Sequence, residues 1–137
     1  GVRAPQPAVR PSLTALAQVL AEVMPVEIED DGALTLRRGA TFASVRMVTI
    51  GDGLEMISLT QVIAWDLAAD DDLRARVAEH AQATMLGTVW LVEHPSGMAD
   101  VMLRYNFPAG DLADQALQTL VLMTLDAGVQ IREALTA

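Results

Sequence analysis

The chain of 137 residues contains no cysteine. Disulfide bonds, thiolate zinc sites, iron–sulfur clusters and thiol nucleophiles are therefore excluded, and nothing in the composition indicates an oxidising compartment. Lysine is also absent, because every basic side chain is an arginine, and this removes Schiff-base and P-loop lysine chemistry. We expect a cytoplasmic protein, long enough to bury a core without covalent or metal cross-links.

Positive charge is scarce. Nine basic residues stand against 18 acidic ones, which gives a formal net charge of −9. Nucleic acids and anionic membranes are bound through cations, so we expect neither as a partner. Uninterrupted apolar runs such as Val89–Val92 are far shorter than the ~18 residues of a membrane span, and the start of the chain has no signal-peptide pattern.

Apolar residues nevertheless make up 52% of the chain. Glycine is not counted in that figure, whereas the usual value of about 45–50% includes it. A protein without a membrane span needs another way to cover such a surplus. We therefore expect either a homodimer or an apolar ligand site.

Groups that could carry catalysis are few. His80 follows Glu79, but no second histidine lies one helical turn away, so the two-histidine zinc helix is excluded. His94 lies beside Glu93 with Asp100 nearby, yet no nucleophile accompanies them, and the serines lack a nucleophile elbow. We expect no catalytic residues and no enzyme activity.

Two acidic segments raise the question of a metal. Glu27–Gly32 has acidic side chains at alternate positions and glycine sixth, as in an EF-hand, but the twelfth position is Arg38 rather than a bidentate glutamate. Asp70–Asp72 is more typical of a helix start than of a magnesium site, and Gly51–Gly53 lacks phosphate-loop spacing. We predict no metal and no cofactor.

The chain divides into a flexible N-terminal arm, residues 1–11, and a single domain, residues 12–137. Helical periodicity with capping residues at Ser12 and Asp70, and a break at Pro108–Asp111 that caps the last helix, predicts three helices. Their expected ranges are Leu13–Met24, Asp71–Met85 and Leu112–Leu135. The second should bury Leu73, Val77, Ala81 and Met85, and the third is apolar nearly all round, so it needs two neighbours.

Extended runs separated by turn residues lie between the first two helices: Val26–Glu29, Ala33–Arg38, Thr41–Ile50 and Leu54–Ile63. A further pair of strands follows the second helix. The pattern predicts three or four strands before the second helix and two after it. This is an α+β fold with an antiparallel sheet of about five strands, in the order α-β-β-β-α-β-β-α.

The pair after the second helix turns at His94–Gly97, which has the proline and glycine of a three-residue hairpin loop. That turn places His94 opposite Met98. One face then carries Val89, Leu91, Val101, Leu103 and Tyr105, and the other carries Trp90, Val92, Met98 and Met102. The second set, with Met47 and Met56 from the meander, forms either a second layer of core or a methionine-rich patch that binds a partner.

Asp31–Gly39 is similar to a glycine-led opening strand, and Gly87–Ala137 supplies a strand, turn, strand and capped helix. With these pieces the chain resembles the YbjN-like family, which shares its fold with type III secretion chaperones, from about Asp31 to Leu135. The chain departs from the family at Ala78 and Ala81, where asparagines are common. The resemblance implies a dimer with a protein-binding or regulatory role, and it supplies no catalytic residues.

Two functions remain open. The first is a dimeric, non-catalytic module that binds a protein or peptide, with Trp90, Val92, Met98 and Met102 as the candidate contact residues. The second is a small-molecule-binding sensory regulator that uses an apolar pocket between the sheet and the last helix.

Overall fold

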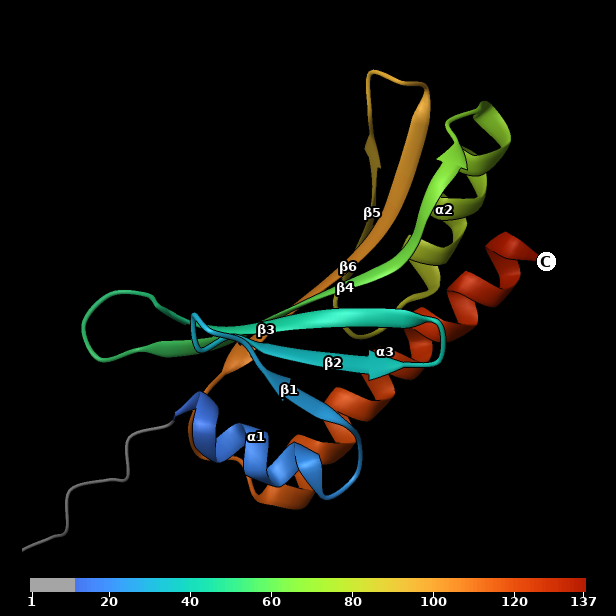
Figure 1. The fold of residues 1–137 in the computed structure, drawn as a ribbon. Coiled ribbons are helices and arrows are strands. Elements are labelled where there is room, and N and C mark those ends of the chain that lie inside the picture. The colour runs from blue at the N-terminus through green and yellow to red at the C-terminus, as the bar shows by residue number, and fades with distance from the viewer. Residues whose placement is uncertain (1–11) are drawn as a thin grey trace, which may run out of the picture.

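The computed structural model describes residues 12–137 and contains one six-stranded sheet with three helices (Figure 1). The predicted arm, residues 1–11, lies outside the described residues. In chain order the elements are α1 (Leu13–Ala21), β1 (Val26–Ile28), β2 (Leu34–Arg38), β3 (Thr41–Thr49), β4 (Glu55–Ala68), α2 (Asp71–Ala83), β5 (Thr88–Glu93), β6 (Met98–Pro108) and α3 (Asp114–Thr136).

The sheet is antiparallel throughout, with the strand order β1-β2-β3-β4-β6-β5. Strands β1 to β4 form a meander, and the β5–β6 hairpin joins it through the β4–β6 pairing, so that β5 is an edge strand. The predicted α+β class is confirmed. The sheet has six strands where about five were expected, and four of them precede α2, the larger of the two numbers that the sequence left open.

Strand β4 continues five residues beyond the predicted end at Ile63. Its pairing with β6 shifts register between Val62 and Ala64 and again between Ala64 and Leu67. Asp66 adopts a positive φ of 57° at the second shift, which is typical of a β-bulge. The bulges interrupt the alternation of apolar and polar residues, and this is why the sequence pattern ended the strand too early.

All three helices pack on one face of the sheet, and the core lies between them (Figure 1). Side chains from alternate positions of the strands meet the apolar sides of the helices there, as a half-covered antiparallel sheet requires. No helix in residues 12–137 is long and apolar enough to cross a membrane. The fully buried large apolar residues are Leu20, Leu34, Leu36, Val45, Leu59, Ile63, Val101, Leu103, Val121 and Leu125.

The first two helices begin as predicted. The Ser12 hydroxyl accepts a hydrogen bond from the Ala15 amide at 3.1 Å, and the Asp70 carboxylate accepts one from the Leu73 amide at 2.8 Å. Each bond satisfies one of the amides that a helix start leaves without a partner. Helix α1 is shorter than expected and ends at Ala21.

Two expectations about helix ends are wrong. Helix α2 ends at Ala83, because Thr84 is extended and its hydroxyl bonds the His80 carbonyl. Met85 consequently leaves the helix and is 90% exposed instead of buried. Helix α3 begins after Ala113, which makes no side-chain capping bond, so the Pro108–Asp111 segment ends the sheet but does not cap the helix.

One polar side chain lies in the middle of the core. Gln61 on β4 is fully buried, and its amide nitrogen donates to the Thr41 hydroxyl at 2.9 Å and to the Leu125 carbonyl at 3.0 Å. Its amide oxygen has no partner in the described residues. A Cβ at Gly128 of α3 would lie 1.9 Å from this oxygen, so the helix approaches the sheet closely only because residue 128 is glycine.

Candidate binding site

The β5–β6 hairpin has the register that the sequence predicts. The His94 amide donates to the Met98 carbonyl at 2.8 Å, and Gly97 adopts a φ of 85° in the turn. The paired residues that follow include Trp90 with Met102. In a strand, successive side chains point to opposite faces, so the two predicted sets of residues are confirmed as occupying opposite faces.

The helices cover the face of the hairpin that carries Val89, Val101 and Leu103, all of which are buried in the core cluster. The other face carries Trp90, Val92, Met98 and Met102. These four side chains are half-buried, and no helix of residues 12–137 lies over them (Figure 1). In the described chain this face is therefore not a second layer of core.

An apolar row crosses four strands on the same face. Met102 pairs with Trp90 on one side and with Val62 on the other, and Val62 pairs with Phe42. We call Trp90, Met102, Val62 and Phe42 the open-face row. All four are half-buried or exposed, and Phe42 is 38% exposed.

The two methionines expected to extend the patch separate. Met56 pairs with Pro108 and with Val48, which places it on the open face. Met47 packs against the core on the helix-covered face, so its assignment to the patch is wrong. The reason is the alternation of β3, in which Met47 has the same parity as the buried Val45.

Arg104 lies beside the row on β6. Its guanidinium is 5.3 Å from the centre of the Trp90 ring, within the range of a cation–π contact. Among the described arginines, only Arg104 and Arg132 form no ion pair with a carboxylate. The exposed face of Arg104 is therefore available to an anionic group.

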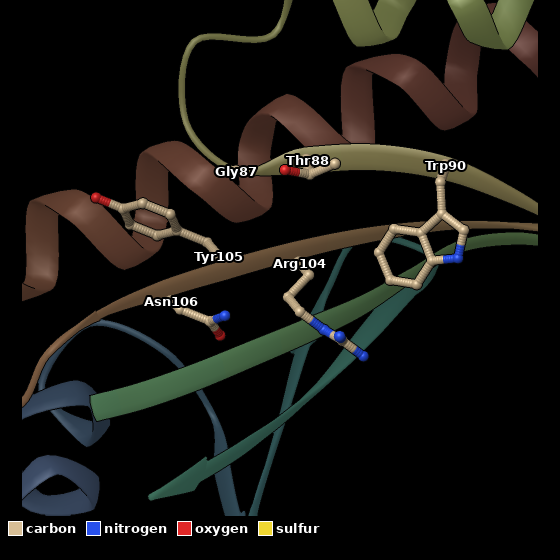
Figure 2. Close-up of a pocket in the computed structure, with 6 residues that line it drawn as sticks. All are labelled: Gly87, Thr88, Trp90, Arg104, Tyr105 and Asn106. Carbon is tan, nitrogen blue, oxygen red and sulfur yellow. The ribbon is translucent and has the colours of Figure 1, made fainter. Parts of the chain in front are cut away.

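An open hollow of about 580 Å³ lies where β5 begins. Figure 2 shows Trp90 and Arg104 on the side of the sheet away from α3, and Tyr105 on the opposite side. Gly87 adopts a φ of 82°, and a Cβ there would lie 2.7 Å from the Arg104 carbonyl, so the chain can enter β5 this close to β6 only with glycine. The hollow is lined by Gly87, Thr88, Trp90, Arg104, Tyr105 and Asn106.

A second arginine–tryptophan contact lies beyond the other end of the row. The guanidinium of Arg132, from α3, is 4.7 Å from the centre of the Trp65 ring and donates to the Ile63 carbonyl at 3.0 Å. Trp65 also lies 5.7 Å from Phe42, ring centre to ring centre. Arg132 thus ties α3 to β4 and supports the aromatic end of the row.

His94 contacts the open face through Asp100, which pairs with Val92 and has the same parity as Met98 and Met102. His94 Nε2 is 2.8 Å from the Asp100 carboxylate, whose other oxygen accepts from the Asp66 amide. This contact joins the hairpin turn to β4 and lowers the pKa of Asp100 below its ordinary value of 3.8, mainly through the hydrogen bond with His94. His80 lies near the end of α2.

The acidic segments make structural contacts. Asp31 accepts from the Ala33 amide and pairs with Arg46, Glu27 pairs with Arg37, and Asp70 caps α2. Within the described residues no group of three or more metal-ligating side chains comes together.

The space between the sheet and the last helix is small. A hollow of about 120 Å³ lies there, lined by residues of α1, the sheet and the start of α3 such as Leu16, Ile57 and Leu117. Pockets that hold small ligands usually measure about 300–1,000 Å³. This part of the structure offers less room than the hollow at Arg104.

Comparison with known proteins defines the class of fold. No protein-family model matches this sequence, and no curated protein matches it. Among solved structures, the type III secretion chaperone SycH of Yersinia pestis, in complex with a stable fragment of YscM2, matches with a TM-score of 0.50 and 10% identity. That match covers 84% of this chain and 98% of SycH. The fold is therefore chaperone-like, as the resemblance in sequence implied.

A second solved structure is more similar. YbjN of E. coli, described as a candidate transcription regulator, matches with a TM-score of 0.64 and 14% identity over 89% of both chains. The protein thus has the YbjN-like fold. At these identities the likeness concerns the fold alone.

Sequence reasoning found the hairpin residues of the site but missed the rest. Arg104 has the parity of Met102 on β6, so the predicted register already placed it on the face of Trp90. Phe42 and Val62 carried no such signal, because their neighbours across the sheet depend on the strand order.

Proposed function

We propose that this protein is a non-catalytic module that binds a protein or peptide through the open face of its sheet. The observation that carries the proposal is the open-face row, an apolar strip across four strands on the face opposite the helices. Exposed contiguous apolar surface on a protein commonly marks an interaction site, and methionine and aromatic side chains adapt well to varied peptides.

The fold supports the same proposal. SycH, whose fold is similar, was solved in complex with a fragment of another protein. The covered face of the sheet forms the core and stabilises the fold. The open face, which carries Trp90 and Met102, can bind a partner without a change in core packing. The 120 Å³ space between the sheet and the last helix gives less support to a small-molecule sensor that uses that space.

We also propose that the protein is a homodimer and that α3 forms the contact. After α1, α2 and the sheet have covered its inner sides, an outward stripe remains on this helix. Met123 is 54% exposed, and Ala116 and Leu120 lie on the same side of the helix at helical spacing. A second copy would remove this stripe from water.

Selection of random peptides displayed on phage against the full chain tests the binding proposal. We expect recovered peptides to be rich in apolar residues and to bind the Met102→Arg variant at least about tenfold more weakly, which corresponds to about 1.4 kcal/mol. The cause is an unpaired cation in the middle of the row. Gln130→Arg, an exposed change on α3, should bind as the wild type does. Equal binding to Met102→Arg would refute the proposed surface.

A further inference from the structure

The last residues of strand β6 have no paired strand on the side where β5 lies. Its pairing with β5 begins at Arg104 opposite Thr88, whereas its pairing with β4 continues to Pro108. Residues Tyr105 to Pro108 are therefore paired with a strand on one side only. The empty side is the place where β5 would lie if it were longer, and the hollow at Gly87 and Asn106 occupies it.

The backbone of Asn106 points to that empty side. In an antiparallel pair, every second residue directs both its N–H and its C=O to the same neighbour. The bond from the His94 amide to the Met98 carbonyl shows that the even-numbered residues of β6 face β5, and the bond from the Ala109 amide to the Glu55 carbonyl shows that the odd-numbered ones face β4. Asn106 is exposed, and its backbone makes no hydrogen bond to a turn or loop within residues 12–137.

Pro108 limits the length of this unpaired edge of β6. It has the same parity as Asn106 and carries no N–H, so it offers only its carbonyl. An incoming strand would therefore meet one donor, the Asn106 amide, and two acceptors, the carbonyls of Asn106 and Pro108. A short segment in an extended conformation fits this set, as in strand addition to other sheet edges.

The side chains beside the edge define the chemistry of the segment. Arg104 is exposed, stacks on Trp90 and has no carboxylate partner. A guanidinium recognises a carboxylate through charge-assisted hydrogen bonds, which are stronger than neutral ones. The net charge of −9 would repel a run of acidic residues, so a single carboxylate between apolar residues fits best.

We propose that the hollow at the start of β5 binds an extended peptide segment that carries one aspartate or glutamate. The segment adds to β6 at Asn106, its carboxylate meets Arg104, and an apolar neighbour packs on Trp90. This inference rests on the proposed peptide-binding function and specifies its ligand. The chain's own residues 1–11 contain no acidic side chain, so they lack the required group.

The charge preference is tested by selecting phage-displayed random peptides on the wild type and on Arg104→Glu. Wild-type selection should enrich an acidic residue at one position between β-branched or aromatic residues, and these peptides should bind Arg104→Glu at least about tenfold more weakly. Arg46→Glu is the matched control, because Arg46 lies on the same face but is already paired with Asp31 at 2.9 Å.

The outcomes separate this inference from the proposed function. Peptides that depend on Met102 but show no acidic preference, or that bind Arg104→Glu unchanged, overturn the inference and leave the binding function standing. Recovery of no peptide overturns both. An Arg104→Glu selection that exchanges the acidic residue for arginine or lysine supports the inference directly.

Strand addition is tested with Asn106→Pro and Asn106→Ala. Proline removes the edge amide without removing a bond to β4, and Pro108 already occupies an equivalent position. We expect Asn106→Pro to lose binding of a wild-type-selected peptide and Asn106→Ala, which keeps the amide, to retain it. Equal loss in both variants would place the contact in the side chain and refute strand addition.

Hydrogen exchange makes the same test without any substitution. On addition of the selected peptide to the wild-type chain, the Asn106 amide should exchange at least about tenfold more slowly, because it enters a hydrogen bond. An unchanged exchange rate refutes strand addition. Loss of the wild-type dimer in Asn106→Pro would instead identify a second copy as the occupant and overturn the peptide proposal.

Discussion

Gln61 lies where α3 packs closely against the sheet. Its amide nitrogen bonds Thr41 and the Leu125 carbonyl, and its amide oxygen lies where a side chain at Gly128 would have to be. Nothing in the sequence indicated this contact. Gln61 in β4 and Gly128 in α3 are far apart in the chain, and they come into contact only when the helix packs on the sheet.

Gly128→Ala is predicted to destabilise the protein by about 2 kcal/mol. Overpacking a core costs about 1–3 kcal/mol, and a displaced Gln61 loses buried hydrogen bonds, which together outweigh the helix propensity of about 1 kcal/mol that alanine gains. Urea denaturation with an unchanged m-value measures the loss. In a Gln61→Ala background the same change should be neutral or stabilising, and an equal loss in both backgrounds would contradict the contact.

A pH-dependent contribution is expected from Asp100. Its folded pKa lies below 3.8 because of the hydrogen bond with His94 and, secondarily, the Asp66 amide. The ionised carboxylate therefore stabilises the folded protein above its unfolded pKa, and this stabilisation is lost as the pH falls from about 4 through the lower folded value. Because the pair is partly exposed, with side-chain exposures of 41% and 27%, the size should be under about 1 kcal/mol.

Thermal unfolding of the wild type and Asp100→Asn between pH 2 and pH 7 measures this contribution. The wild type should be the more stable protein at pH 6, and the difference should close toward pH 2. Asp52→Asn, in the exposed β3–β4 loop, serves as the control and should track the wild type. A difference that stays constant over the whole range would show that the carboxylate charge plays no part.

At the scale of elements, the sequence predicted what depends on near neighbours. Helix starts at Ser12 and Asp70 and the hairpin register were correct, because capping bonds and turn geometry involve residues within a few positions of one another. The end of β4 and the exposure of Met85 were missed. The end of β4 depends on its bulges, and the exposure of Met85 depends on the end of α2 at Ala83. Hydrophobic periodicity predicts neither feature.

The start of α2 provides a test at this scale. Asp70→Ala should cost about 1 kcal/mol, because the Leu73 amide loses its acceptor. Asp70→Asn keeps an acceptor oxygen and should cost less. Asp72→Ala, on the exposed first turn where Asp72 lies 3.9 Å from Arg76, should have a smaller effect in chemical denaturation. An equal cost for Asp70→Ala and Asp72→Ala would contradict a specific cap.

At the scale of the whole molecule, the alternation of apolar residues placed Trp90 and Met102 together but did not reveal which hairpin face was open. Both faces are apolar, and the choice is made by where α2 and α3 pack. The sequence pattern therefore predicted a candidate partner surface on the hairpin, but the packing of the helices determines which face of the hairpin is open (Figure 1).

Dimerisation through α3 has a direct test. The double variant Leu120→Arg and Met123→Arg places two cations in the outward stripe, and it should sediment at 14.6 kDa where the wild type at micromolar concentration sediments at twice that mass. Gln130→Arg should remain dimeric. A wild type that sediments at 14.6 kDa would contradict the proposed dimer.

The central position of β4 has a consequence for how the molecule opens. This strand pairs with β3 on one side and with β6 on the other, and it joins the meander to the hairpin. Opening it breaks two ladders and separates the halves of the core, so its amides from Ile57 to Ile63 should be released only with global unfolding. The three-residue β1 lies at an edge of the sheet and pairs only with β2, so it can detach alone. The amides of β1 should therefore exchange through frequent local opening, while those at the centre of β4 exchange only when the whole protein unfolds.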